Sequence, residues 1–269
     1  MRAAAWILLL GLVLGGGIAQ AQTSVGPEGA GSQASLAVPE ATDENEERAA
    51  ASLAHIVERG ATLYNRPDSA APVSRLPVRT PLHRQQCSNG WCRVRTDAGR
   101  RGYVPQAAMS SVWVRVSKAQ RRVFLYRGPE LLEVFEADVG YNTFADKKRR
   151  GSRTLRDHWR TPEGVFYVVE KNPDSRFYKA LVLNYPTTAD ARRGLEQGLI
   201  SRDQYEAIAA AQADFRMPPM DTKLGGWIEL HGKGTGAATT WTQGCVAVTN
   251  NHMDRLWAMV EEGTPVLIE

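Results

Sequence analysis

The chain has 269 residues, of which 43% are hydrophobic and 8% aromatic, and its formal net charge at pH 7 is +4. This is the composition of an ordinary globular protein. The basic excess is too small to indicate a nucleic-acid-binding protein, so we expect no nucleic-acid partner.

The first residues have the parts of a secretory signal peptide. Met1-Arg2 gives a positive start, residues 6–14 are apolar, and Ala19-Gln20-Ala21 is the small-x-small pattern that signal peptidase cuts. The apolar stretch is short and is followed by glycines, so we expect no membrane span after processing. The sequence predicts a signal peptide over residues 1–21 and an exported, periplasmic protein.

Residues 22–54 are rich in Ala, Ser, Gly and Glu and include an acidic run at residues 43–47. A segment with so few large apolar residues cannot form a core. We therefore expect a flexible leader. Whether a short helix begins near Glu46 is left open by the pattern.

Residues 55–111 read as short strands joined by turns. Asn89-Gly90 is a preferred two-residue hairpin turn, since both positions need a positive φ. In that register Cys87 faces Cys92 as a non-hydrogen-bonded pair, where side chains approach most closely. An exported protein can keep a disulfide, so we predict one between Cys87 and Cys92 and a reduced Cys245.

The same region resembles a bacterial SH3-type domain. The resemblance is carried by residues 63–67, by residues 89–95 and by Gly102-Tyr103-Val104. It implies a small barrel. Such domains commonly help to target wall enzymes, although a role as a purely structural spacer is equally compatible with the sequence.

Residues 112–269 read as a second, larger unit that is mainly β. Alternating apolar and polar residues at 112–116, 122–126, 133–140 and 164–169 predict strands, as do residues 180–185. The period becomes helical between Thr187 and Phe215, where Ser201 and Gln204 form a capping-box signature. A last helix over 253–260, capped by Asn250 or Asn251, and a last strand complete the predicted unit.

Cys245 is the candidate nucleophile. A cysteine reacts as the thiolate and needs a base or a positive neighbour to reach it. His231, fourteen positions upstream at the end of a strand pattern, can supply that base and form a thiolate–imidazolium pair. Gly232 and Gly244 stand beside these two residues, where we expect the backbone to approach a substrate closely. The alternative is an inert buried thiol and a core histidine.

The second unit resembles the L,D-transpeptidase (YkuD-like) catalytic domain family. Residues 123–126, Gly140 and residues 160–166 match its early strands and its Thr-Pro-x-Gly turn, residues 228–232 match its strand ending in His-Gly, and residues 242–250 match its [ST]-x-G-C segment. Two departures are visible. Many members carry a His before the Gly-Cys and an Arg two positions after the Cys, whereas this chain has Gln243 and Ala247.

The resemblance implies acyl transfer without a metal or other cofactor. Cys245 would attack the bond between diaminopimelate and D-Ala in a peptidoglycan tetrapeptide, with His231 moving the proton. The Gly232 carbonyl would orient the imidazole, and the N–H groups of Gly244 and Cys245 would form an oxyanion hole. We expect the substrate to contact residues 241–243, that is Trp241, Thr242 and Gln243.

The acyl acceptor stays open at this point. A second stem peptide would give a cross-link, a lysine of a wall-anchored lipoprotein would give anchoring, a free D-amino acid would give exchange, and water would give hydrolysis, as in an L,D-carboxypeptidase or amidase. Two rival classes of protein also combine such residues. In a papain-like hydrolase the Cys precedes a distant His, and only His252 follows Cys245 here. A non-catalytic wall-binding protein is the second rival.

Overall fold

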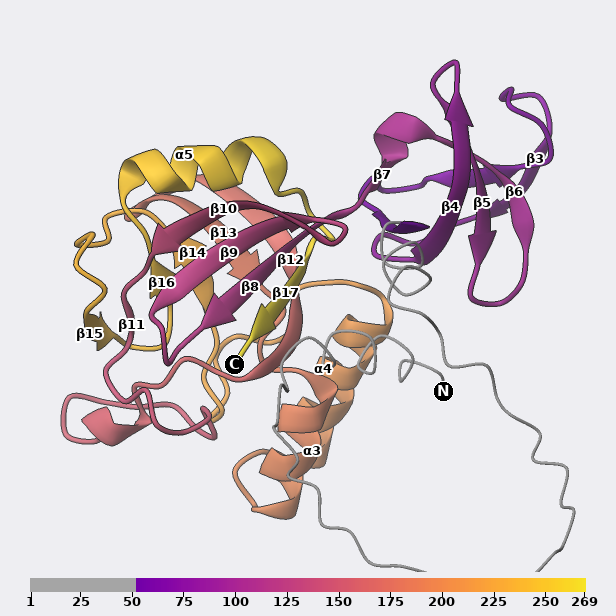
Figure 1. The fold of residues 1–269 in the computed structure, drawn as a ribbon. Coiled ribbons are helices and arrows are strands. Elements are labelled where there is room, and N and C mark those ends of the chain that lie inside the picture. Colours follow the sequence, from indigo (N-terminus) through magenta and orange to yellow (C-terminus); the bar gives the residue numbers. More distant parts are fainter. Residues whose placement is uncertain (1–51) are drawn as a thin grey trace, which may run out of the picture. The chain divides into compact units, whose positions relative to one another are not determined.

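The computed structural model describes residues 52–269, and the predicted signal peptide and most of the predicted leader lie outside this range. The described chain is mainly β, as the sequence predicts, with an N-terminal antiparallel sheet followed by a larger β-rich domain that carries three α-helices (Figure 1).

The N-terminal sheet has seven strands in the order β3-β2-β6-β5-β4-β1-β7. The strands are β1 (Leu53–Ile56), β2 (Thr62–Tyr64), β3 (Pro72–Arg75), β4 (Pro81–Ser88), β5 (Trp91–Thr96), β6 (Arg101–Pro105) and β7 (Met109–Ser110). β1 begins at Leu53, so it takes up the last residues of the predicted leader. Alternate residues of β5 and β6, such as Val94 and Val104, are fully buried in a separate small core.

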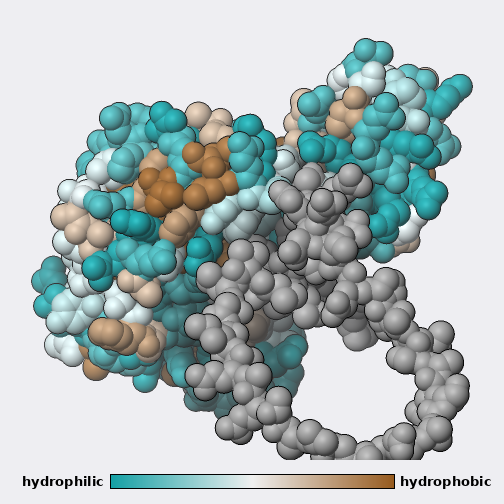
Figure 2. All heavy atoms as spheres, in the orientation of Figure 1, coloured by the Kyte–Doolittle hydropathy of each residue, from teal (hydrophilic) through white to brown (hydrophobic). Residues whose placement is uncertain are grey.

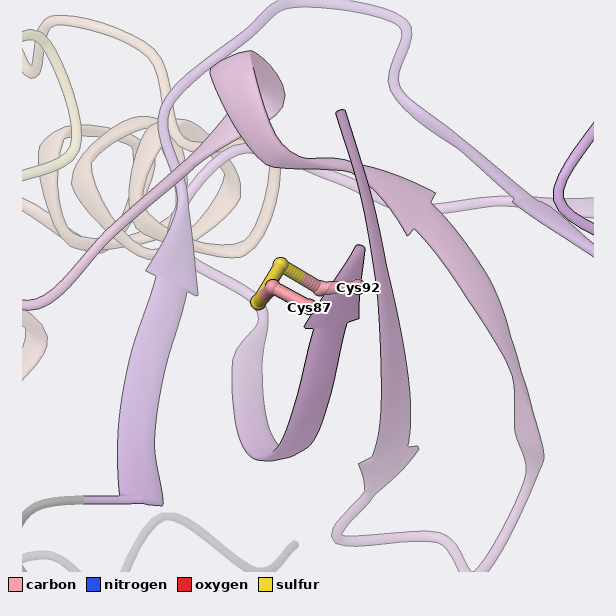
Figure 3. Close-up of a disulfide and its surroundings, with 2 residues drawn as sticks. All are labelled: Cys87 and Cys92. Atoms are coloured by element: carbon pink, nitrogen blue, oxygen red, sulfur yellow. A yellow bond between two sulfur atoms is a disulfide. The ribbon is translucent and has the colours of Figure 1, made fainter. Parts of the chain in front are cut away.

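The β4–β5 hairpin is closed by a disulfide between Cys87 and Cys92 (Figure 3). Asn89 and Gly90 both have positive φ, of 50° and 77°, as a tight hairpin turn requires. Cys87 pairs with Cys92 across the ladder at a Cα–Cα distance of 4.0 Å. The chain has three cysteines, so Cys245 is left as the free thiol.

The larger domain is built on an eight-stranded sheet in the order β10-β9-β8-β17-β12-β13-β14-β16, with a separate two-stranded sheet of β11 and β15. Its strands are β8 (Val112–Ser117), β9 (Arg122–Arg127), β10 (Glu130–Glu136), β11 (Val139–Gly140), β12 (Gly164–Ser175), β13 (Tyr178–Leu183), β14 (Glu229–His231), β15 (Thr240–Thr242), β16 (Val246–Ala247) and β17 (Pro265–Ile268). The C-terminal strand β17 lies between β8 and β12, which closes the chain's end into the sheet.

Three helices accompany this sheet in the described chain. α3 (Thr188–Glu196) and α4 (Arg202–Ala213) form the helical insertion, and each begins with a capping box, at Thr187 and at Ser201. The sequence signature at Ser201 is thus confirmed, whereas the equivalent signal at Thr187 was missed. The pair has its own small core, which includes Ile208 and Leu224.

The last helix, α5 (Asn250–Met259), packs near β13 (Figure 1). Its N-cap is Thr249, whose hydroxyl accepts the N–H of His252 at 3.3 Å, so the prediction of an asparagine cap was wrong. The Asn250 side chain is used elsewhere, because its Oδ1 accepts the N–H of Lys233 at 2.8 Å.

Among residues 52–269, no helix is long and apolar enough to cross a membrane. The face drawn in Figure 2 is mostly hydrophilic, with one hydrophobic patch over the edge strand β10. Leu131 and Val134 on that strand are 48% and 43% exposed. The patch lies outside the cavity described below.

Candidate active site

Cys245 stands on a tight turn between β15 and β16, and Thr242 fixes that turn. The Thr242 hydroxyl donates to the carbonyl of Cys245 at 2.7 Å and accepts the N–H of Gly244 at 3.2 Å. Gly244 has a φ of +136°, which a residue with a side chain rarely adopts. The turn therefore holds the half-buried thiol of Cys245, which donates to the Trp227 carbonyl at 3.3 Å.

His231 is brought to this turn by strand pairing. β14 runs parallel to β16, with Leu230 opposite Val246 and His231 opposite Ala247. His231 and Cys245 consequently line the same cavity, whose volume is about 670 Å³. The sequence places these two residues fourteen positions apart, and the adjacent strands bring them to one site.

The imidazole of His231 is held on three sides. Its Nδ1 lies 2.7 Å from the Gly232 carbonyl, and because a carbonyl only accepts, Nδ1 must carry the proton and Nε2 the lone pair. The Phe177 ring stacks on the imidazole at 4.3 Å between centroids, and the Trp241 ring meets it edge-on at 6.5 Å. The ring is thus fixed in position and in tautomer.

Gly232 and Gly244 both stand where the backbone is close to another part of the chain. A Cβ on Gly232 would lie 2.7 Å from Asn250 Oδ1, and a Cβ on Gly244 would lie 2.6 Å from the carbonyl oxygen of Arg160. Each glycine therefore allows a close approach within the protein's own chain. The Gly244 N–H is also occupied by Thr242, which leaves Cys245 as the candidate backbone donor for an oxyanion.

The three residues expected to contact substrate fall into two groups. Trp241 is 40% exposed and Gln243 is also exposed, and both line the cavity. Thr242 is 2% exposed and spends its hydroxyl on the turn. Thr242 lines the cavity as well, but its hydroxyl supports the Cys245 turn, whereas its two neighbours expose more of their side chains to a ligand.

Burial disfavours the charged forms of both the thiol and the imidazole, which opposes the expected thiolate–imidazolium pair in the absence of substrate. Burial, with a smaller contribution from the Glu229 carboxylate, raises the pKa of Cys245 to about 12. A backbone hydrogen bond from Glu229 and the charges of Lys147 and Arg176 act in the opposite direction. Burial also lowers the pKa of His231, although the Gly232 carbonyl counteracts this. Both charged forms are disfavoured because the site is desolvated.

Asp138 organises the loop that carries Trp241, and sequence reasoning missed it. Its buried carboxylate accepts hydrogen bonds from the N–H and hydroxyl groups of Thr235 and Thr239, at 2.7–3.0 Å, and from Trp241 Nε1 at 2.8 Å. Burial acts to raise the pKa of Asp138, but the hydrogen bonds from Thr235, Trp241 and Thr239 outweigh it and lower the pKa. An isolated Asp after a strand gave no signal in the sequence.

Comparison with known proteins agrees with this geometry. The model of the L,D-transpeptidase catalytic domain (YkuD) matches residues 111–268, which is more than half of the chain, and a bacterial SH3 domain model matches residues 57–111. The chain belongs to the L,D-transpeptidase catalytic domain family. An SH3-type domain precedes its catalytic domain.

Individual relatives are distant. YafK of Escherichia coli K12, a protein named after the L,D-transpeptidases, is 31% identical over 101 residues, which are 35% of this chain and 38% of YafK. The matched segment thus spans little more than a third of that relative.

Solved structures give a similar picture. Bdellovibrio bacteriovorus Bd1075 is 24% identical over 60% of this chain and 48% of its own, with a TM-score of 0.39. The helical cell shape determining protein Pgp2 of Campylobacter jejuni is 19% identical over the same shares, with a TM-score of 0.38.

Proposed function

We propose that this chain is a cell-wall cysteine acyltransferase, an L,D-transpeptidase that attacks the diaminopimelate–D-Ala bond of peptidoglycan tetrapeptides through Cys245. The hydrogen bond between His231 Nδ1 and the Gly232 carbonyl, at 2.7 Å, carries this proposal. It leaves Nε2 as a proton acceptor in the cavity that also contains the thiol. A histidine that only filled the core would not need a fixed tautomer with Nε2 free to accept a proton beside the free cysteine.

The first half-reaction forms a thioester. His231 Nε2 takes the thiol proton as Cys245 Sγ attacks the carbonyl carbon, so that a neutral pair becomes charged only as the bond forms. The tetrahedral intermediate carries its negative charge on oxygen, toward which the Cys245 N–H can donate. The carbon–nitrogen bond then breaks, the leaving amine takes the proton from His231, and D-Ala departs.

The second half-reaction reverses these steps with a new acceptor. An amine of another stem peptide, a lysine of a wall-anchored lipoprotein, a free D-amino acid or water gives its proton to His231 and attacks the thioester carbonyl. The thiolate leaves and is reprotonated. Peptidoglycan stem peptides are therefore the donor, and the acceptor decides between cross-linking, anchoring, exchange and hydrolysis.

The exposed part of the cavity suits such a donor. Arg150 and Arg176 line it and are exposed, and a tetrapeptide stem carries carboxylates that guanidinium groups bind well. Trp227 and Trp241, 49% and 40% exposed, offer flat apolar surfaces beside these charges. Because this substrate lies outside the cytoplasm, we propose that the protein is exported to the periplasm and that its SH3-type domain contacts the wall.

The test is release of D-Ala from purified disaccharide tetrapeptide by the mature protein, followed by mass spectrometry. We expect free D-Ala and an acyl adduct on the peptide that contains Cys245. Cys245→Ala should abolish both with an unchanged circular dichroism spectrum, and His231→Ala should slow release by about 100-fold or more. His83→Ala, which changes a histidine on β4 away from the cavity, is the matched control and should be fully active.

The products identify the acceptor, since dimers indicate cross-linking and tripeptides indicate hydrolysis. A folded protein that releases no D-Ala from tetrapeptides or from sacculi would contradict the proposal. That result would favour the non-catalytic wall-binding class.

A further inference from the structure

Lys147 is a buried lysine beside the nucleophile turn. It is 3% exposed, it lines the cavity with Cys245, and its ammonium donates to the carbonyls of Gln243 and His158 at 3.3 and 3.4 Å. Among residues 52–269, no carboxylate forms an ion pair with it. A buried ammonium that is satisfied by carbonyls alone is costly and needs an explanation.

Two glycines make room for this side chain. A Cβ on Gly225 would lie 3.2 Å from Lys147 Cε, and a Cβ on Gly244 would lie 3.4 Å from Lys147 Nζ. Both glycines have positive φ, of +95° and +136°. The end of the lysine is thus inserted against the same turn that presents the Cys245 thiol.

The helical insertion holds Lys147 in place. Arg193 on α3 donates to the Lys147 carbonyl at 3.2 Å and pairs with Asp190 at 2.6 Å. Arg150, three residues after Lys147, donates its backbone N–H to the Lys223 carbonyl at 2.8 Å. The insertion therefore supports the loop that carries the lysine, which gives these helices a role beyond covering the sheet.

Many related domains carry an arginine two positions after the cysteine, and this chain has no cation there. Ala247 occupies that position and is fully buried, with its N–H and carbonyl both bonded to the backbone of Asp138 at 2.8 Å. We propose that Lys147 is a positioning residue whose ammonium stabilises the thiolate of Cys245. The proposal rests on the proposed function only in taking Cys245 as the nucleophile.

The charge of Lys147 depends on pH in a useful range. Burial lowers the pKa of Lys147 to about 8, and the charged groups that act on it are Cys245, Arg150, Arg160 and Asp146. The lysine is therefore cationic below pH 8 and loses its proton above it. A cation close to a cysteine lowers the thiol pKa, so the benefit to Cys245 should exist below pH 8 and fade above it.

Alkylation of Cys245 by iodoacetamide tests this directly, because it reports thiolate and needs no peptidoglycan turnover. The full mature chain with its Cys87–Cys92 disulfide has one free thiol. We expect Lys147→Met to lower the alkylation rate about tenfold at pH 6.5, which corresponds to one pKa unit. The difference from the wild type should narrow as pH rises through 8.

Two further variants make the test decisive. Lys147→Arg keeps its charge at high pH, so it should be alkylated faster than the wild type above pH 8. Lys148→Met, which removes the exposed neighbouring charge, should follow the wild-type profile. Parallel profiles for Lys147→Met and wild type at all pH values would overturn the proposal and leave Lys147 a purely structural residue. If Lys147→Met does not fold, identical profiles for Lys147→Arg and wild type overturn it.

Discussion

Glu229 and His231 project from the same face of β14, two residues apart, and both line the cavity that holds Cys245. The pKa of Glu229 is raised to about 7, chiefly by burial. The charge of Arg176 opposes this rise and that of Glu170 adds to it. An acid with a pKa near 7 therefore stands beside the proposed base, His231. When it ionises, its negative charge opposes a thiolate at Cys245.

We predict that Glu229→Gln makes Cys245 more reactive at pH 8. The substitution removes a negative charge that disfavours the thiolate, so the alkylation rate should rise several-fold there. At pH 5.5 the wild-type carboxyl is already neutral, and the two rates should agree. A stopped-flow series across pH 5–9 checks this, with Glu130→Gln on β10 as control, and a constant ratio across the series would contradict it.

The same residue predicts a pH dependence of stability. Its folded pKa of about 7 lies above the ordinary value of 4.5, so the folded state binds the proton more tightly than the unfolded chain. The protonated Glu229 makes its full contribution to the unfolding free energy below pH 4.5, and this contribution is lost as pH rises through 7. Urea unfolding should find Glu229→Gln equal to the wild type at pH 4.5 and more stable at pH 8. A lower stability at pH 8 would count against the argument.

Asp138→Asn should disorder the loop of residues 235–241. The amide presents donors to the groups of Thr235, Thr239 and Trp241 that now donate to the carboxylate, so the cost should be about 1–3 kcal/mol of unfolding free energy. Because the pKa of Asp138 is lowered, this stabilisation is lost as pH falls through its folded pKa. Faster hydrogen exchange confined to this loop is the expected signature. Unchanged hydrogen exchange in Asp138→Asn would mean that the loop is ordered without the Asp138 carboxylate.

Thr242 allows a separation of turn geometry from chemistry. Thr242→Ser keeps the hydroxyl that bridges Gly244 and Cys245 and should keep activity, whereas Thr242→Val has the same shape without it. The valine leaves a buried N–H and a carbonyl unpaired, so D-Ala release should fall by at least tenfold with little change in fold. Equal activity of the two variants would show that the turn is held by packing alone.

The disulfide should matter for stability and not for chemistry. Replacing both Cys87 and Cys92 by serine removes a closure of only six residues, worth about 2 kcal/mol in the chain-entropy view. We expect a lower melting temperature with unchanged D-Ala release. Without a reductant, mass spectrometry should find one alkylatable thiol per wild-type chain. Three would contradict the pairing in the exported protein.

The sequence was informative where one local rule decides the structure. The Asn89-Gly90 turn set the register that pairs Cys87 with Cys92, and the capping box at Ser201 set the start of α4. The resemblance to the family likewise implied that the Gly232 carbonyl orients the His231 imidazole, and the two groups lie 2.7 Å apart. These features depend on residues a few positions apart, which a pattern can register.

The rest depends on contacts between distant segments. Asp138 meets Thr235 and Trp241 about a hundred positions away, and Lys147 meets the Gln243 carbonyl at a similar separation. The reasons for Gly232 and Gly244 are also distant neighbours, Asn250 and Arg160. The raised pKa of Cys245 follows from burial, which no single motif encodes.

The helices α3 and α4 pack through a small cluster of their own, Ala191, Ile200, Ile208 and Leu224, separate from the main core. Such satellite clusters can open locally before the whole domain unfolds. Because Arg193 of this pair holds the Lys147 carbonyl, opening would release the loop that supports the nucleophile. On heating, the proposed activity should therefore be lost reversibly before the sheet unfolds, so that two short helices set the upper temperature for D-Ala release.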